Sequence, residues 1–315
     1  IGARSTMAAN TTGASNIALG SFTLDVNTTG INNVAIGPSA MGANINGDYN
    51  IAIGTGALAS ATTADYNIAL GYEALKSSTT GNHNSAVGHK ALDANTSGTG
   101  NVAQGYGALG ANTAGSYNVA DGYQALTSST TGNNNVASGY QSLFYTQNGN
   151  DNIALGYKAG EGTSGQSFSN GIFLGYQTGL ALTNGDNNIM IGYSTGSNVN
   201  TGSSNILIGY DVDAPSATAN GQMSIGNLIF GTDIDGTGTT PSTGNIGVGY
   251  TSPSQKLHVN GQVLATSFNG DGSALTGVTA TMGIDDLTDA TVASSSVLVG
   301  SSSYADDGSD NNNTA

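Results

Sequence analysis

The sequence predicts an all-β fold in which the chain winds as a parallel solenoid of 17-residue coils. The phrase Asn-apolar-Ala-apolar-Gly recurs thirteen times with a nearly constant step, and such a fixed period is typical of solenoids. The chain also has 49 glycines among 315 residues, which leaves few side chains for a thick core. The glycine that ends the phrase, here called the anchor glycine, recurs with a step of 17, apart from a single step of 19: Gly20, Gly37, Gly54, Gly71, Gly88, Gly105, Gly122, Gly139, Gly156, Gly175, Gly192, Gly209 and Gly226.

Each unit contains two predicted strands and two turns. In the unit at 67–75, the run Asn-Ile-Ala-Leu-Gly alternates in the manner of a strand, and Tyr-Glu-Ala-Leu follows as a second strand. The anchor glycine permits the bend between them, and a polar turn such as Ser-Thr-Thr-Gly at 78–81 closes the coil. Thirteen coils stacked at about 4.8 Å predict a rod of roughly 60 Å.

The alanine in the middle of the phrase predicts contact between chains. It lies on the strand face opposite the two large apolar side chains, which we expect to fill the coil. A small side chain on the other face allows close approach, so we expect a homo-oligomer packed along this face. The alternative is an alanine exposed beneath a turn. The residues are Ala18, Ala35, Ala52, Ala69, Ala86, Ala103, Ala120, Ala137 and Ala154.

The recurring Asn-Val/Ile-Ala-Ile/Leu-Gly followed by Tyr-x-Ala-Leu resembles the head repeats of trimeric autotransporter adhesins and of bacteriophage tail fibres. The resemblance covers residues 1 to about 230. It implies a left-handed parallel β-roll, an intertwined homotrimer, an extracellular, cell-surface or virion-surface location, and no catalysis.

A second resemblance lies at 244–278, where the chain reads Gly-Asn-Ile-Gly-Val-Gly, Thr-Ser-Pro-Ser-Gln-Lys-Leu-His-Val and Phe-Asn-Gly-Asp-Gly-Ser-Ala-Leu-Thr-Gly-Val. It is similar to the connector that precedes the self-cleaving chaperone domain of tail-fibre and tail-spike proteins. The resulting organisation is a β-roll at 1–230, a connector or neck at 231–295, and the start of a further β-roll at 296–315.

The two ends of the sequence fit together in phase. Joining the terminal Asn-Thr-Ala to the initial Ile-Gly writes the repeat phrase, and it places Gly2 where the next anchor glycine is due after Gly300. We therefore expect one cassette of a tandem array or filament that continues end to end. The alternative is a boundary that falls inside the motif by chance.

Composition restricts the partners. The net charge of −15 opposes nucleic acid and anionic membranes. The chain has no cysteine and no apolar run of the length that spans a bilayer. No Ser/His/Asp order indicates an enzyme, and no motif indicates a cofactor. His83, His89 and His258 show no repeating metal spacing and are interpreted as solvated loop residues.

Acidic and polar positions leave a few candidate sites. Asp211 and Asp213, and Asp233 and Asp235, carry alternate carboxylates near turns and are weak calcium candidates. At the position before the anchor glycine, polar residues replace apolar ones in three successive coils, and Asp121 is a further weak metal candidate. We interpret this stretch as a buried polar plug with ordered water or an ion, or alternatively as a locally exposed stretch. Its residues are Gln104, Asp121 and Ser138.

Tyrosine follows many anchor glycines and predicts a ladder of stacked rings. The alternative is a sugar-stacking stripe, with Tyr72, Tyr106, Tyr123, Tyr140 and Tyr157 as glycan candidates; Tyr176, Tyr193 and Tyr210 continue the series.

Together these features predict a structural repeat unit of a long extracellular, trimeric, adhesin-like filament or stalk. The alternatives are a shaft segment of a phage tail fibre that attaches to a host receptor, and a glycan-binding surface module. The expected partners are further copies of the chain and a cell-surface or glycan receptor.

Overall fold

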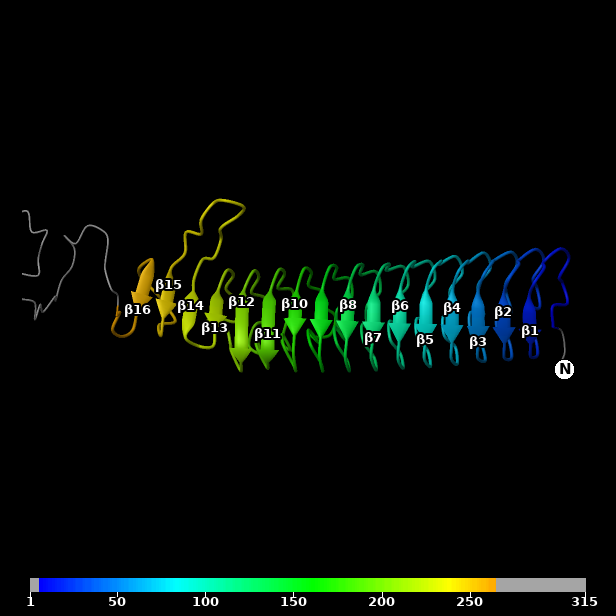
Figure 1. Cartoon of the computed structure of the whole chain (residues 1–315), viewed down its shortest axis with the longest axis horizontal. Coiled ribbons are helices and arrows are strands. Elements are labelled where there is room, and N and C mark those ends of the chain that lie inside the picture. Colours follow the sequence, from blue (N-terminus) through cyan, green and yellow to red (C-terminus); the bar gives the residue numbers. More distant parts are fainter. Residues whose placement is uncertain (1–5, 265–315) are drawn as a thin grey trace, which may run out of the picture. The chain divides into compact units, whose positions relative to one another are not determined.

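Each copy of the repeated phrase forms a short strand, and the strands stack in chain order along one sheet (Figure 1). The computed structural model describes residues 6–264, and this part of the chain contains strands and turns but no helix. The strands are β1 (Ile17–Leu19), β2 (Val34–Ile36), β3 (Ile51–Ile53), β4 (Ile68–Leu70), β5 (Ser85–Val87), β6 (Val102–Gln104), β7 (Val119–Asp121), β8 (Val136–Ser138), β9 (Ile153–Leu155), β10 (Ile172–Leu174), β11 (Ile189–Tyr193), β12 (Ile206–Tyr210), β13 (Met223–Ile225), β14 (Ile229–Gly231), β15 (Ile246–Val248) and β16 (Leu257–Val259).

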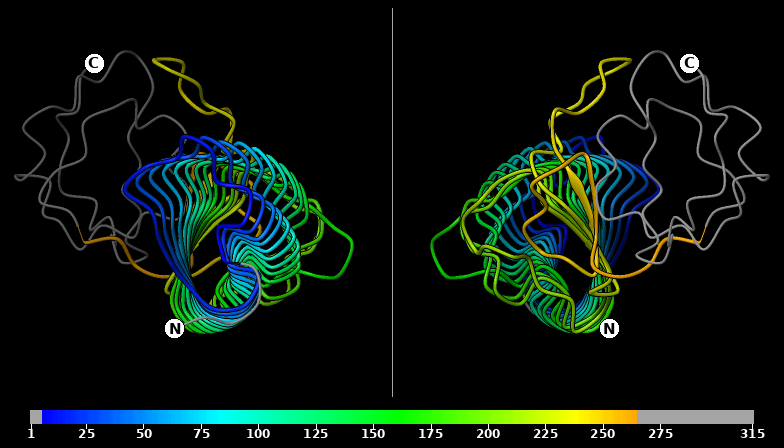
Figure 2. Two further views of the ribbon diagram at one scale, coloured as in Figure 1. Left: turned by 90° about the vertical axis from the view of Figure 1, so that its right-hand side faces the viewer. Right: turned by 90° about the vertical axis from the view of Figure 1, so that its left-hand side faces the viewer.

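The strands from β1 to β13 pair in parallel, and each residue pairs with its equivalent in the next coil. Ala69, for example, pairs with Ala86, which holds the same place one coil further on. Seen along the stack, the coils nearly superimpose and rotate gradually (Figure 2). Where the step is 19, Ile153 still pairs with Ile172, because the two extra residues are absorbed outside the strands. The predicted parallel solenoid of 17-residue coils is therefore confirmed.

The predicted second strand is wrong. The residues after the anchor glycine, such as Glu73 and Leu75, have φ angles of 54° and 51°, in the left-handed region that strands do not visit. Their N–H groups nevertheless bond to neighbouring coils in alternate directions: Glu73 donates to Thr55 of the preceding coil and Leu75 donates to Ala91 of the following one, both at 3.0 Å. The residues after the anchor glycine, here called the second arm of the coil, are held by hydrogen bonds between coils, although their backbone is not extended.

The two faces of the strand are the reverse of the expectation. The mid-phrase alanines from Ala35 to Ala154 are fully buried inside the coil, whereas the flanking large residues, such as Ile51 and Ile53, point outward and are 37% and 41% exposed. The argument that the alanines meet another chain is therefore wrong. The coil is narrow, and leucines of the second arm already occupy its interior. They form a column of fully buried residues with Met41 at one position: Leu24, Met41, Leu58, Leu75, Leu92, Leu109, Leu126 and Leu143.

Small and large side chains exchange places inside the last parallel coils. Phe173 takes the position of the strand alanine and is fully buried, while glycine takes the place of leucine in the second arm. A Cβ added to Gly160 or Gly179 would lie 2.8 Å from the ring of Phe173. Met190 faces Gly196 in the same way, with 2.3 Å between the added Cβ and the Met190 sulfur. The interior volume is thus conserved while its contributors change.

The anchor glycines from Gly20 to Gly192 are required by both conformation and contact. Gly88 has a φ of 144°, and a Cβ placed on it would lie 2.3 Å from the carbonyl oxygen of Gly105. Other glycines of the series make equivalent approaches to the next coil. No other residue type fits this bend, because the next coil's backbone occupies the space of the side chain.

The parallel stacking ends at β13. The chain reverses, so that β14 pairs antiparallel with β13 and with β15, and β16 returns to parallel pairing with β15. The segment between β14 and β15 projects from the stack (Figure 1). The connector predicted at 231–295 begins at the end of β14. Its part beyond 264 and the further β-roll predicted at 296–315 lie outside the described residues.

Candidate functional site

The outward face of the strands forms an apolar stripe made of two columns of side chains. Each strand from β1 to β4 and from β9 to β13 places two large apolar side chains on this face, on either side of the inward-facing residue. Ile17, Leu19, Ile68 and Leu155 are each more than a third exposed. The in-register pairing puts equivalent side chains one strand spacing apart along the stack. Contiguous exposed apolar surface of this kind is typical of an interaction site.

A polar notch interrupts one of the two columns of this stripe in β6, β7 and β8, and Ser85 in β5 interrupts the other. Gln104, Asp121 and Ser138 occupy successive positions of the outer column, and they pair in register with one another. Gln104 and Asp121 are exposed and Ser138 is half-buried. In a single chain the notch therefore faces outward, which corrects the interpretation of a buried plug inside the coil and agrees with the alternative of an exposed stretch.

The residues after the anchor glycines form the predicted aromatic ladder. Nine rings stack with centroid separations of 4.9 to 5.3 Å, and His89 fills the one position that tyrosine leaves open between Tyr72 and Tyr106. Each internal ring is covered on both faces by its neighbours. Sugar stacking uses a ring face, so only edges and the two terminal rings are open to a glycan. The terminal Tyr210 is 74% exposed.

A shorter aromatic stack lies at another position of the coil. Tyr49, Tyr66 and His83 are stacked in order, with ring centroids 5.0 Å apart. His83 and His89 are exposed and lie outside the strands, as expected of solvated loop residues, and both also belong to aromatic stacks. His258 departs from the expectation, because it lies in β16 and is half-buried. Both stacks follow from the period, because equivalent residues of successive coils lie one strand spacing apart.

Buried asparagines form a ladder that the sequence reasoning missed. The first residue of the phrase is buried in nearly every coil. The Oδ1 atom of Asn118 accepts the backbone N–H of Asn135 at 2.9 Å, and its Nδ2 atom donates to the carbonyl of Gly132 at 2.8 Å. The same pair of bonds recurs from Asn33 to Asn135. The recurrence of asparagine beside apolar residues in the sequence was the signal from which this ladder could have been predicted.

A second polar column lies in the turn. Asn27 donates to Asn10, Asn44 donates to Asn27, and Asn112 donates to Asn95 through side-chain amides at 2.8 to 2.9 Å. The same side chains also donate to backbone carbonyls of the turn, as Asn27 does to Gly30 at 3.2 Å and Asn95 to Gly98 at 3.1 Å. Most buried polar groups of the column are thereby hydrogen-bonded, whereas the Oδ1 atoms of Asn44 and Asn112 have no partner among the described residues. Both asparagine columns are structural, because their hydrogen-bonding groups point along the stack.

The acidic candidates lie in the last coils and the projecting segment. Asp213 accepts hydrogen bonds from the Ser197 hydroxyl and the Asn198 N–H at 3.1 and 3.2 Å. Asp211 and Asp233 are not enclosed by the coil, and their φ angles are 52° and 50°. Within residues 6–264, no three His, Cys, Asp or Glu side chains gather as a metal site would require.

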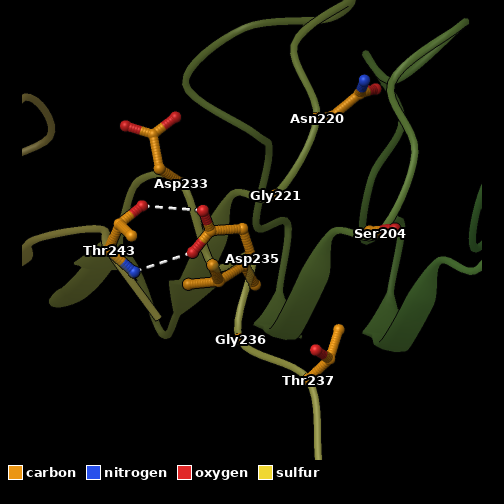
Figure 3. A pocket seen from close by; sticks show the side chains of 9 residues that line it. Ser204, Asn220, Gly221, Asp233, Asp235, Gly236, Thr237 and Thr243 are labelled. Atoms are coloured by element: carbon orange, nitrogen blue, oxygen red, sulfur yellow. Dashed lines mark hydrogen bonds between the residues drawn. The ribbon is translucent and has the colours of Figure 1, made fainter. Parts of the chain in front are cut away.

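Asp235 joins the two sides of the projecting segment between β14 and β15 through hydrogen bonds. Its carboxylate accepts hydrogen bonds from the Thr243 hydroxyl and N–H, both at 2.7 Å, and from the Ser242 hydroxyl at 3.1 Å. These bonds, led by that from the Thr243 hydroxyl, lower the pKa of Asp235 to about 2. Figure 3 shows Thr243 facing Asp235, whereas the Asp233 carboxylate points away.

An open hollow of about 510 Å³ lies beside this segment and is lined by polar groups of the last coils, including Ser204 and Asn220. Asn220 is engaged in the stack, since its Oδ1 accepts the N–H of Ser203 at 2.7 Å. The hollow's lining contains no aromatic side chain and no basic group among the described residues. It is therefore a weaker candidate for a binding site than the apolar stripe.

Compared with protein-family models, curated proteins and solved structures, the chain matches none of them. In residues 6–264 the structure contains no helix that could cross a bilayer.

Proposed function

We propose that this chain is a structural repeat unit of a long extracellular, adhesin-like filament or stalk, without catalysis, in which three copies wind as left-handed β-rolls and pack side by side along the apolar stripe. The observation that carries the proposal is the exposed apolar face of the strands. The predicted interface on the alanine face is replaced by one on the opposite face, where large side chains provide the contact.

The size of the stripe supports this role. Twelve strand spacings of about 4.8 Å and three residues at about 3.3 Å outline a face of about 600 Å², which includes the polar notch and Ser85. Its apolar part falls within the roughly 300 to 600 Å² found for the largest apolar patch of a monomer. The whole face approaches the roughly 800 Å² that each partner contributes to a stable interface.

The periodicity of the stripe favours another copy of this chain as the partner. A second coil with the same rise presents its side chains at the same axial spacing, so the two surfaces match over the full length of the stack. Stacked coils, held by backbone hydrogen bonds and the asparagine and tyrosine columns, suit a load-bearing stalk. The acidic surface keeps such a rod soluble.

The assembly is tested by measuring the mass of the purified chain with analytical ultracentrifugation. We expect a trimer, and we expect monomers after Ile51→Lys with Ile68→Lys, which place two charges on the stripe. The matched control is Ser97→Lys, in an exposed turn, which should leave the trimer intact. A monomeric wild-type chain would refute the proposed assembly, and imaging of the native particle tests the filament itself.

A further inference from the structure

Six asparagines within residues 6–264 are followed directly by glycine, and all six asparagines are exposed. In this dipeptide the glycine nitrogen can attack the side-chain carbonyl carbon of the asparagine, because glycine has no side chain to obstruct the approach. From sequence and asparagine exposure alone, the six pairs are equivalent. They are Asn46–Gly47, Asn148–Gly149, Asn170–Gly171, Asn184–Gly185, Asn220–Gly221 and Asn260–Gly261.

The structure separates the last pair from the other five by the burial of the glycine. The glycine is buried in each of the first five pairs, whereas Gly261 is exposed. The carbonyl oxygen of Ala64 in the next coil fills the space of a Cβ on Gly47, and the Gly202 carbonyl oxygen does so at Gly185. Nothing lies within 4 Å of a Cβ placed on Gly261. The five coil turns are therefore packed, and the sixth pair is open.

Hydrogen bonding of the attacking nitrogen adds to this difference. The N–H of Gly171 donates to the Asn152 Oδ1 atom at 2.8 Å, and the N–H of Gly221 donates to the Ser203 carbonyl at 2.9 Å. Attack requires the main chain of the pair to rotate, which in a packed turn requires local opening of the stack. The Gly261 N–H donates no hydrogen bond to the part of the chain that the structure describes.

We propose that Asn260 is a site of spontaneous deamidation by water, while the five asparagines of the coil turns are protected. The Gly261 nitrogen forms a bond to the Cγ atom of Asn260, and the Asn260 side-chain nitrogen takes up the displaced proton and leaves as ammonia. Water then opens the resulting succinimide. Opening at Cγ gives aspartate, and opening at the main-chain carbonyl gives isoaspartate. The inference is independent of the proposed assembly.

The reaction changes how the end of β16 is attached to β15. Asn260 follows β16 directly, and its Nδ2 atom donates to the Gly249 carbonyl at 3.2 Å, while its N–H donates to the Val248 carbonyl at 2.9 Å. A carboxylate only accepts hydrogen bonds, so the bond from Nδ2 is lost and two oxygens face each other. Isoaspartate also adds a methylene to the main chain. Deamidation therefore loosens the end of this strand pair.

Ageing of the purified chain tests the proposal. The chain is kept in warm, mildly alkaline buffer and then digested with pepsin in acid, where further deamidation is slow. Mass spectrometry of the peptides measures the converted fraction at each of the six asparagines, and electron-based fragmentation distinguishes aspartate from isoaspartate. A parallel sample in urea gives the rate of each pair without the fold. Asn260→Gln is the matched control, because it keeps the amide but requires a larger ring, and it should stay unconverted.

In the folded chain, we expect Asn260 to convert at least about tenfold faster than each of the other five asparagines. In urea, all six should convert at similar rates. Equal rates at Asn260 and Asn46 in the folded chain would overturn the inference. Hydrogen exchange tests the consequence: the amide of residue 260 should exchange faster in Asn260→Asp than in Asn260→Gln, and equal exchange would overturn the loosening of β16.

Discussion

Removing one member of the asparagine ladder should destabilise the whole stack. Asn118→Ala leaves two buried groups without their partners: the N–H of Asn135 and the carbonyl of Gly132, which lie 2.9 and 2.8 Å from the Asn118 side chain. Each orphaned group costs about 1 to 3 kcal/mol. The free energy of unfolding should therefore fall by about 2 to 6 kcal/mol.

Urea unfolding followed by circular dichroism measures this loss, and amide hydrogen exchange at Asn135 reports its local part. Asn46→Ala, in an exposed turn, is the matched control and should change stability by less than about 0.5 kcal/mol. The reasoning would be refuted if Asn118→Ala lost less than about 1 kcal/mol, or if exchange at Asn135 stayed as slow as in the wild type.

Two further predictions concern the interior and the projecting segment. Phe173→Ala should lower the free energy of unfolding by about 3 to 5 kcal/mol, because it leaves a cavity. Gly160→Leu should also destabilise the chain, because the leucine clashes with the Phe173 ring. In the double variant the leucine fills the cavity, so thermal melting should show a smaller loss of stability than the sum of the two single losses. The pKa of Asp235 is lowered to about 2, so its carboxylate is protonated only in strong acid. Its hydrogen bonds to Ser242 and Thr243 are complete above about pH 4 and are lost as the pH falls through 2. The Thr243 amide NMR signal should therefore shift in that range in the wild type and not in Asp235→Asn.

The period and the strand positions could be predicted because they depend only on alternation and spacing. The stacked tyrosines followed from the same spacing. His89 was not recognised as part of that ladder, although it occupies the equivalent place in its coil. In each case the fixed period stacks the equivalent residues of successive units in one column along the sheet.

The inside of the coil could not be assigned from alternation, since alternation defines two faces without saying which is buried. The deciding fact is the second arm, where Leu75 and its equivalents adopt a left-handed backbone that leucine rarely visits. A leucine there fills the narrow interior and leaves room only for alanine opposite. The sequence did contain a signal: Phe173 appears where Gly160 and Gly179 replace leucine.

The predicted contact surface was placed on the wrong face of the strand for the same reason. Once the alanines are inside, the large apolar residues and the polar notch become the outer surface. Asp121 was noticed as a break in the pattern, but its role depends on which face meets water. The hydrogen bonds of Asp235 could not be predicted, because its partners Ser242 and Thr243 lie in an irregular segment outside the repeat.

The asparagine ladder has a consequence for how such a chain changes length over evolutionary time. The donors and acceptors of the ladder are matched at separations of 14 or 17 residues. Copying or deleting one whole unit therefore re-pairs every group with an identical substitute, whereas an insertion of any other size must be expelled into a loop. Slippage during DNA replication can thus lengthen or shorten the molecule by single rungs without passing through an unfoldable intermediate.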